Sequence, residues 1–238
     1  MSVGRFVAAL RAAPAPVIAE VKPFSPAAGD LIGARDVAGI AAAYAGAGVP
    51  CLSVTTGAWH GGRPDMVAEL ARTGLPVLRK DFIVSQAHLM QSRDLGASAV
   101  LLTCTLIRPR DLRRLAEAAL ALEMTPFVEA ASATELADLD LPEGAVLAIN
   151  NRDIRTRETD GGGIERSLSL QAQAREKAGA GLLVSASGIE TPAEARRLMA
   201  AGFDAMLIGT ALMGAGAGIG DQTRAFLAAA QRCPVPQA

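Results

Sequence analysis

The feature that most constrains the fold is a repeated alternation of short apolar segments with longer amphipathic ones. The short segments show little of the two-residue periodicity of a strand with one wet face, so we expect strands buried on both faces. Strands alternating with helices predict a parallel sheet with right-handed crossovers. Eight such units favour a closed barrel over an open sheet of about five or six strands. The predicted strands are Val17–Lys22, Cys51–Val54, Pro76–Arg79, Ala99–Leu102, Thr125–Val128, Val146–Ile149, Gly181–Val184 and Ala205–Ile208.

The length and the helix start signals agree with this interpretation. A chain of 238 residues fits a fold that typically has about 250. Ser132 with Glu135 and Thr191 with Glu194 have the spacing of a capping box, and Pro192 suits a first helical position. No linker or low-complexity stretch divides the chain. We therefore predict a single (β/α)8 TIM barrel of the α/β class, one domain over the whole chain from 1 to 238, with its active site at the C-terminal ends of the strands.

Composition excludes several functional classes. The net charge of -1 and an aromatic content of 3% argue against nucleic acid or a membrane surface as a partner. Cys51, Cys104 and Cys233 are scattered without metal-ligand spacing, which is typical of small core side chains in a reducing compartment. His60 and His88 also lack a partner at ligand spacing. With no signal peptide and no long apolar run, we expect a cytoplasmic protein without a metal site.

Four charged residues lie at or near the C-terminal ends of predicted strands. Glu20 and Lys22 are two residues apart on the first strand and therefore point the same way. Lys80 follows the third strand and Glu129 the fifth. A mutually satisfied ion pair would explain any two of these residues. Two lysines and two carboxylates that converge on one mouth favour catalysis instead, because mutual proximity moves their pKa values apart and supplies both an acid and a base.

Small and polar residues follow the last three strands. Asn150–Arg152 could orient hydroxyl and carboxylate groups or could serve only as turn residues. Ser187–Gly188 and Gly209–Thr210 lie where this fold usually binds phosphate, since small residues let backbone N–H groups approach an anion. Ordinary tight turns are the alternative. Trp59 could wall a pocket or simply cover the barrel top.

Six motifs, taken together and in this order, resemble indole-3-glycerol phosphate synthase. The resemblance covers nearly the whole chain from Val17 onward, and the combination is far more specific than any one motif. The motifs are Ile18–Pro26 (IAEVKPFSP), Leu52–Thr56 (LSVTT), Leu78–Phe82 (LRKDF), Phe127–Glu129 (FVE), Ile149–Asp153 (INNRD) and Ser187–Ile189 (SGI).

The resemblance implies a lyase of tryptophan biosynthesis. Members of the family convert 1-(2-carboxyphenylamino)-1-deoxyribulose 5-phosphate to indole-3-glycerol phosphate by ring closure, decarboxylation and dehydration, without a metal or organic cofactor. We therefore expect a small-molecule sugar phosphate as substrate and a monomer or homodimer as the working form.

The resemblance also implies a role for each matching residue. Lys80 would be the general acid that protonates the sugar carbonyl, and Lys22 would hold the substrate carboxylate. Glu129 would be the base for the loss of water, while Glu20 and Asn150 would orient and stabilise charged intermediates. The phosphate end would be lined by Ser25, Arg152, Ser187, Gly188, Gly209 and Thr210, and the aryl ring would be flanked by Trp59 and Phe82.

Two departures from the family pattern keep other hypotheses open. Ala186 stands where the family has a glutamate, and only about sixteen residues precede the first strand, where the family has a longer extension. A diverged paralogue of specialised metabolism would close a ring on a different amino-deoxyketose phosphate. A non-catalytic barrel would bind a phosphorylated ligand or a partner protein. A pathway isomerase would more naturally use an Asp/Cys or Glu/His pair at strand ends, which the sequence does not offer.

Overall fold

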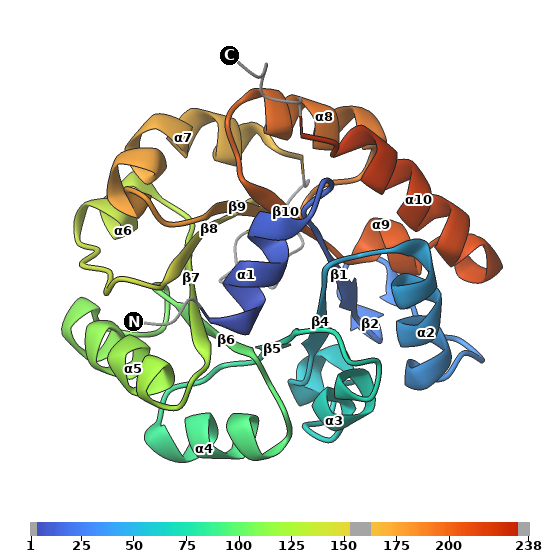
Figure 1. Cartoon of the computed structure of the whole chain (residues 1–238), viewed down its shortest axis with the longest axis horizontal. Coiled ribbons are helices and arrows are strands. Elements are labelled where there is room, and N and C mark those ends of the chain that lie inside the picture. Colours follow the sequence, from blue (N-terminus) through green and yellow to red (C-terminus); the bar gives the residue numbers. More distant parts are fainter. Residues whose placement is uncertain (1–3, 153–162, 233–238) are drawn as a thin grey trace.

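Eight parallel strands close into a barrel in the computed structural model, which describes residues 4–152 and 163–232 (Figure 1). Each strand pairs with the next along the chain, and the last pairs with the first. The predicted (β/α)8 barrel is confirmed. The strands are β1 (Val17–Val21), β4 (Cys51–Thr55), β5 (Val77–Lys80), β6 (Ala99–Thr103), β7 (Thr125–Ala130), β8 (Val146–Asn150), β9 (Leu183–Ala186) and β10 (Ala205–Ile208).

Helices surround the barrel on all sides in Figure 1. They are α1 (Arg5–Ala12), α2 (Val37–Ala47), α3 (Met66–Ala71), α4 (Gln86–Asp94), α5 (Pro109–Ala121), α6 (Ala133–Ala137), α7 (Glu165–Ala178), α8 (Pro192–Ala200), α9 (Thr210–Met213) and α10 (Ile219–Ala229), with short 3-10 turns η1 (Ala58–His60) and η3 (Gly216–Gly218). A small hairpin, β2 (Phe24–Ser25) and β3 (Gly29–Asp30), follows β1. Within the described ranges, no helix has the length and apolar character needed to cross a membrane.

Strand boundaries differ from the prediction in one systematic way. Most strands continue one or two residues beyond the apolar segment, so that Lys80, Glu129 and Asn150 belong to β5, β7 and β8. These polar side chains break the apolar pattern because they face the site rather than the core. At its start, β9 is shorter than predicted, since Gly181 lies in the turn after α7, where a Cβ would be 2.9 Å from the carbonyl oxygen of Ala178.

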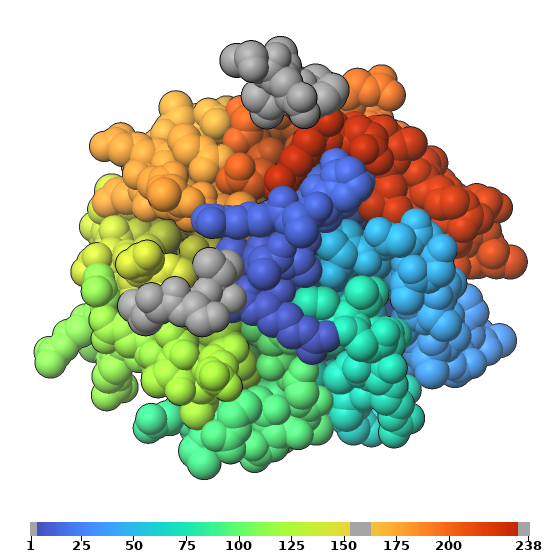
Figure 2. Space-filling model, in the orientation of Figure 1, coloured from blue at the N-terminus to red at the C-terminus, as the bar shows by residue number. Residues whose placement is uncertain are grey.

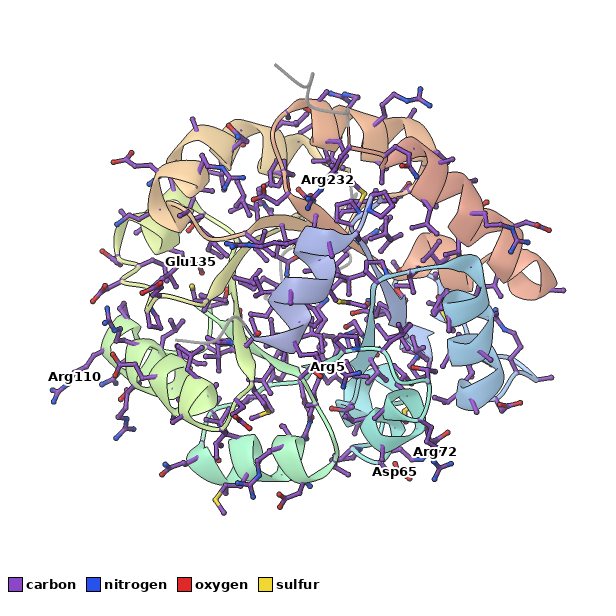
Figure 3. All side chains as sticks on the ribbon, in the orientation of Figure 1. Arg5, Asp65, Arg72, Arg110, Glu135 and Arg232 are labelled. Atoms are coloured by element: carbon purple, nitrogen blue, oxygen red, sulfur yellow. The ribbon has the colours of Figure 1, made fainter. Side chains whose placement is uncertain are left out.

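Helix α1, which the sequence did not predict, closes the N-terminal mouth of the barrel. Phe6, Val7 and Leu10 are buried against inward-facing strand residues, and the ring of Phe6 meets that of Phe127 edge to face at 6.4 Å. Arg232, labelled in Figure 3, donates hydrogen bonds to the backbone carbonyl oxygens of Leu10 and Arg11 in α1. The space-filling view shows α1 lying over the centre of this face (Figure 2). The opposite mouth is left for the functional site.

The predicted capping box at α8 is confirmed, while the one at α6 is only half formed. Thr191 Oγ1 accepts a hydrogen bond from the backbone N–H of Glu194, whose carboxylate accepts one from the N–H of Thr191. At α6, Ser132 Oγ accepts from the N–H of Glu135, but the Glu135 carboxylate accepts from the N–H of Ala131 instead of that of Ser132. The return hydrogen bond from the Glu135 carboxylate therefore reaches one residue earlier than in a capping box.

Replacing Thr191 by alanine should lower the free energy of unfolding by about 1 kcal/mol, because α8 loses its N-cap acceptor. Urea unfolding followed by circular dichroism measures this change. Thr134→Ala is the matched control, since Thr134 is exposed within α6 and does not cap a helix. Equal stability of the two variants would contradict the capping role.

Candidate active site

Strand periodicity carries the charged residues into the C-terminal mouth of the barrel. Successive inward-facing residues are two positions apart, so the charge on each of three strands lies one layer above an inward-facing core residue. Glu20 follows Ile18 on β1 and Lys80 follows Leu78 on β5. Glu129 follows Phe127 on β7 in the same way.

These charged groups are almost completely removed from solvent. Glu20, Lys22, Lys80 and Glu129 are 2%, 4%, 8% and 1% exposed. Burying a charge is costly unless it is paired or has a function. The structure pairs Glu20 with Lys80, places Glu20 and Lys22 on one cavity, and puts Glu129 near the C-terminal end of β7.

Glu20 on β1 contacts side chains of β4 and β5. Its Oε2 atom lies 3.6 Å from Nζ of Lys80, and the Ser53 hydroxyl donates a 3.4 Å hydrogen bond to the same oxygen. The Tyr44 hydroxyl, fully buried beneath, donates to the backbone carbonyl of Glu20 at 3.1 Å. Burial and the nearby Glu20 carboxylate raise the pKa of Tyr44, so this phenol stays protonated and acts as a fixed donor. The Lys80 ammonium thus faces a carboxylate that Ser53 contacts, on a residue whose backbone carbonyl Tyr44 holds.

Glu129 and Asn150 form a second polar pair on adjacent strands. The Asn150 side-chain amide donates to Oε1 of Glu129 at 2.6 Å. The carbonyl oxygen of the same amide accepts from the backbone N–H of Arg152 at 2.9 Å, which fixes its orientation. An amide oriented in this way can hold a carboxylate in place without competing with it for a proton.

Lysine is rare in this chain, which has three lysines and twenty arginines, yet two of the three lysines lie at this mouth. Arginine stays charged under all ordinary conditions, while a lysine amine can release a proton when its surroundings favour the neutral form. Lysine at these two positions therefore fits proton transfer as well as charge neutralisation.

A cavity of about 250 Å³ opens beside Lys22, at the ends of β1, β9 and β10. Both residues of the Ser187–Gly188 turn adopt left-handed backbone conformations, with φ of 65° and 67°. Small residues line this wall, so backbone groups can approach a bound anion closely. The polar side chains and glycines lining the cavity are Glu20, Lys22, Arg152, Ser187, Gly188, Glu190, Gly209 and Thr210.

Asn151 holds this turn in place, a role that the sequence did not reveal. Its side-chain amide donates to the Ser187 carbonyl oxygen at 2.9 Å and to Ser185 Oγ at 3.0 Å. Its own carbonyl oxygen accepts from the backbone N–H of Ser167 in α7 at 2.9 Å. This amide, on a residue that is 4% exposed, therefore joins the end of β8, the Ser187–Gly188 turn and α7. A buried second asparagine directly after Asn150 is the only sequence sign of this role.

The remaining predicted residues lie around the rim. Trp59 in η1 stacks on Phe82 with the ring centroids 5.5 Å apart and the planes 11° apart. Ser25 is buried in the β2 hairpin but is not among the described side chains that line the cavity. The His60 ring lies against that of Trp59, with the centroids 3.6 Å apart and the planes tilted by 33°, and its Nδ1 lies 3.0 Å from the Phe24 carbonyl oxygen. Asp153 of the INNRD motif lies outside the described residues.

Ala186, the departure from the family pattern, is completely buried at the end of β9. It lies opposite Asn150 on β8 and Leu207 on β10 and packs into the apolar barrel interior. The carboxylate of Glu20 instead leans over the neighbouring strand, since Oε1 would be 2.6 Å from a Cβ at Gly209. The wall of the site is therefore apolar at Ala186.

Metal ligands do not gather in the described part of the chain, where no group of three His, Cys, Asp or Glu side chains could hold an ion. Cys51 is buried and Cys104 is half-buried, as expected for small core residues, while Cys233 lies outside the described residues. Burial, together with the carboxylates of Glu135 and Glu129, raises the pKa of the Cys104 thiol to about 12. The thiol is therefore unreactive.

The fold and the buried lysines and carboxylates at one mouth define the class as a (β/α)8-barrel enzyme. A family model, that of indole-3-glycerol phosphate synthase, matches residues 2–223, and the chain belongs to this family. It is 42% identical over 215 residues to indole-3-glycerol phosphate synthase 2 of Streptomyces coelicolor, covering 89% of this chain and 80% of that protein. It is 37% identical over 199 residues to the synthase of Rhodopirellula baltica, covering 83% and 74%.

Solved structures support the fold independently. A tryptophan synthase structure from M. tuberculosis, in an open form, aligns with a TM-score of 0.68 over 96% of this chain and 99% of that chain, at 12% identity. A protein from Aquifex aeolicus VF5 aligns with a TM-score of 0.69 at 11% identity, covering 96% of this chain and 100% of that one. At such low identity the likeness concerns the barrel alone.

Proposed function

We propose that this protein is an indole-3-glycerol phosphate synthase, a carboxy-lyase of tryptophan biosynthesis. Its substrate would be 1-(2-carboxyphenylamino)-1-deoxyribulose 5-phosphate and its products indole-3-glycerol phosphate, carbon dioxide and water. The observation that carries this proposal is the buried Lys80–Glu20 pair, with 3.6 Å between Nζ and Oε2, in the mouth that also holds the Ser187–Gly188 turn. One substrate that joins a carbonyl to a phosphate would reach both.

In the first step, the aryl carbon that bears the carboxylate attacks the sugar carbonyl carbon. Lys80 gives its proton to the carbonyl oxygen as the new carbon–carbon bond forms, and a positioned general acid of this kind contributes about 10²–10⁴-fold to the rate. Lys22, which lines the cavity, holds the substrate carboxylate by charge. Carbon dioxide then leaves, and the electron pair of the broken bond restores the aromatic ring.

In the last step, the new hydroxyl group leaves as water and the indole double bond forms. Glu129 would accept the proton that the ring system loses, while a lysine ammonium protonates the departing hydroxyl. Asn150 donates to Glu129 at 2.6 Å, so the carboxylate is oriented before the proton arrives. Two carboxylates and two amines in one buried site supply the acid and the base that this sequence of steps requires.

The decisive assay is turnover of the carboxyphenylamino-deoxyribulose phosphate by the purified protein, followed by indole fluorescence, with Lys80→Ala as the blank. We expect turnover at ordinary enzymatic rates. Absence of product together with retained phosphate-dependent binding would reject the proposal.

The expectation of a cytoplasmic monomer or homodimer remains a prediction that sedimentation and fractionation can test.

A second candidate function rests on Ala186. The apolar wall at this position could accept an amino-deoxyketose phosphate with a different aryl group, as expected of a diverged paralogue. Ala186→Glu discriminates between the two candidate functions. If the protein is an ordinary synthase, it already turns over the standard substrate, and the restored carboxylate should raise this turnover or leave it unchanged. A protein specific for another substrate would gain activity on the standard one only after this change.

The Ser187–Gly188 turn offers a test of the phosphate end. Gly188→Ala should raise KM about tenfold with a smaller effect on kcat, because it removes binding shared by the ground and transition states. A Cβ at Gly188 would lie 2.6 Å from the carbonyl oxygen of Gly163, and φ is 67°. Steady-state kinetics measure the change, with Gly218→Ala as control because no heavy atom lies within 4 Å of its added Cβ. An unchanged KM would place the phosphate elsewhere.

A further inference from the structure

The first charged residue of the LRKDF motif, Arg79, has no part in the mechanism above, yet it is buried. It faces away from the barrel interior and is 3% exposed. Its guanidinium donates to Thr56 Oγ1 at 3.2 Å, Gln91 Oε1 at 2.9 Å, Ser92 Oγ at 3.1 Å and Asp81 Oδ2 at 3.0 Å. A guanidinium buried with this many partners fixes the segments that supply them.

Asp81 connects the loop after β4 with the loop after β5. Its Oδ2 atom accepts the Thr56 hydroxyl proton at 2.7 Å in addition to the Arg79 guanidinium. Its Oδ1 atom accepts from the backbone N–H of Phe82 at 2.8 Å. One carboxylate therefore sets the position of Thr56 on one loop and the backbone direction of Phe82 on the other.

The aromatic pair lies beside the same carboxylate. A Cβ at Gly57 would be 2.8 Å from Nε1 of Trp59 and 3.4 Å from Oδ1 of Asp81, so the indole edge and the carboxylate share the space that glycine leaves open. Phe82, whose N–H is held by Asp81, stacks on Trp59 at 5.5 Å. Trp59 itself is 37% exposed and also lies against the His60 ring, with the centroids 3.6 Å apart.

Lys80 lies between Arg79 and Asp81 in the sequence and points into the barrel, opposite to them. We propose that Arg79, Asp81 and Thr56 are positioning residues, a network that sets the Trp59–Phe82 stack at a fixed place relative to the Lys80 amine. Its catalytic consequence rests on the proposed function, whereas its effect on Trp59 does not. The network would hold the aryl end of the substrate at the distance from which its carbon attacks the carbonyl.

Two adjacent threonines give a matched pair of isosteric variants. The Thr56 hydroxyl both accepts from Arg79 and donates to Asp81, while the Thr55 hydroxyl, also buried, has no hydrogen-bond partner among the described residues. Thr56→Val therefore breaks the network and Thr55→Val leaves it intact. Thr56→Ser, which keeps the hydroxyl, tests rescue.

Trp59 is the only tryptophan of the chain, so its fluorescence reports on the stack without any substrate. In Thr56→Val we expect emission shifted to longer wavelength and stronger quenching by acrylamide, with Thr55→Val and Thr56→Ser like the wild type. We also expect a fall in kcat/KM of about tenfold, since small misplacements of a reacting group already reduce rates strongly. Failure of the proposed function would abolish turnover but leave the fluorescence result standing.

Unchanged Trp59 fluorescence in folded Thr56→Val would overturn the positioning network, whatever happens to turnover. Changed fluorescence with unchanged kcat/KM would overturn its catalytic consequence. If Thr56→Val does not fold, Asp81→Asn replaces it. This variant keeps the size of the side chain but removes the negative charge of the carboxylate that accepts from Arg79 and Thr56. The same spectral shift is expected there, and its absence would equally reject the network.

Discussion

Replacing Lys80 by alanine should reduce kcat/KM by about 10²–10⁴-fold, the contribution of a positioned general acid. Lys80 is buried, and its amine faces the Glu20 carboxylate at 3.6 Å in the mouth of the barrel. Stopped assays of indole-3-glycerol phosphate formation measure the loss. Lys80→Arg should be nearly as inactive, because a guanidinium keeps the charge but does not release a proton.

Lys177→Ala is the matched control for Lys80→Ala. Lys177 is the third lysine of the chain and donates to the carbonyl oxygens of Ala137 and Leu139 on the outer surface. Its removal should leave kinetics unchanged. Thermal unfolding must be recorded beside the kinetics, since the loss of the Lys80 amine leaves the Glu20 carboxylate buried without that partner. A folded Lys80→Ala protein with nearly full activity would remove Lys80 from the mechanism.

The sequence predicted the barrel and the convergence of its charges because both follow from the two-residue period of a strand. Once the inward face of β1 is known from Ile18, the position of Glu20 is determined, whereas Lys22, predicted as the last residue of this strand, directly follows it. The same periodicity places Lys80 and Glu129. The catalytic roles of these residues remain predictions until they are measured.

What the sequence did not predict depends on distant partners. Helix α1 has only eight residues, too short to be stable alone, and forms because Phe6, Val7 and Leu10 pack into the barrel mouth. Arg79 would ordinarily be assigned to the solvent, yet α4 supplies the acceptors that allow its burial. For Asn151 the sequence left open whether it orients a ligand or serves as a turn residue, and neither interpretation named the partners that it holds. Only the assembled barrel shows which groups these side chains meet.

Replacing Gly209 by alanine should lower kcat/KM by about 100-fold, because it displaces a catalytic pair by an amount on the order of 1 Å. A Cβ at Gly209 would lie 2.6 Å from Oε1 and 3.3 Å from Cβ of Glu20. The carboxylate alone could swing away, but the second contact involves the stem of the side chain. Glu20 must therefore move, and the 3.6 Å contact of its Oε2 with Lys80 would be lost.

A double-mutant cycle separates this mechanism from a general defect in the barrel. In a Glu20→Ala background the carboxylate is gone and only the 3.3 Å contact with the Cβ at position 20 remains, so adding Gly209→Ala should have a much smaller further effect on kcat/KM. Gly218→Ala, with open space around its added Cβ, should be silent in both backgrounds. If the Gly209 and Glu20 effects instead multiply as independent factors, Gly209 acts through the backbone or the phosphate end, and the Glu20–Lys80 geometry is not what glycine protects.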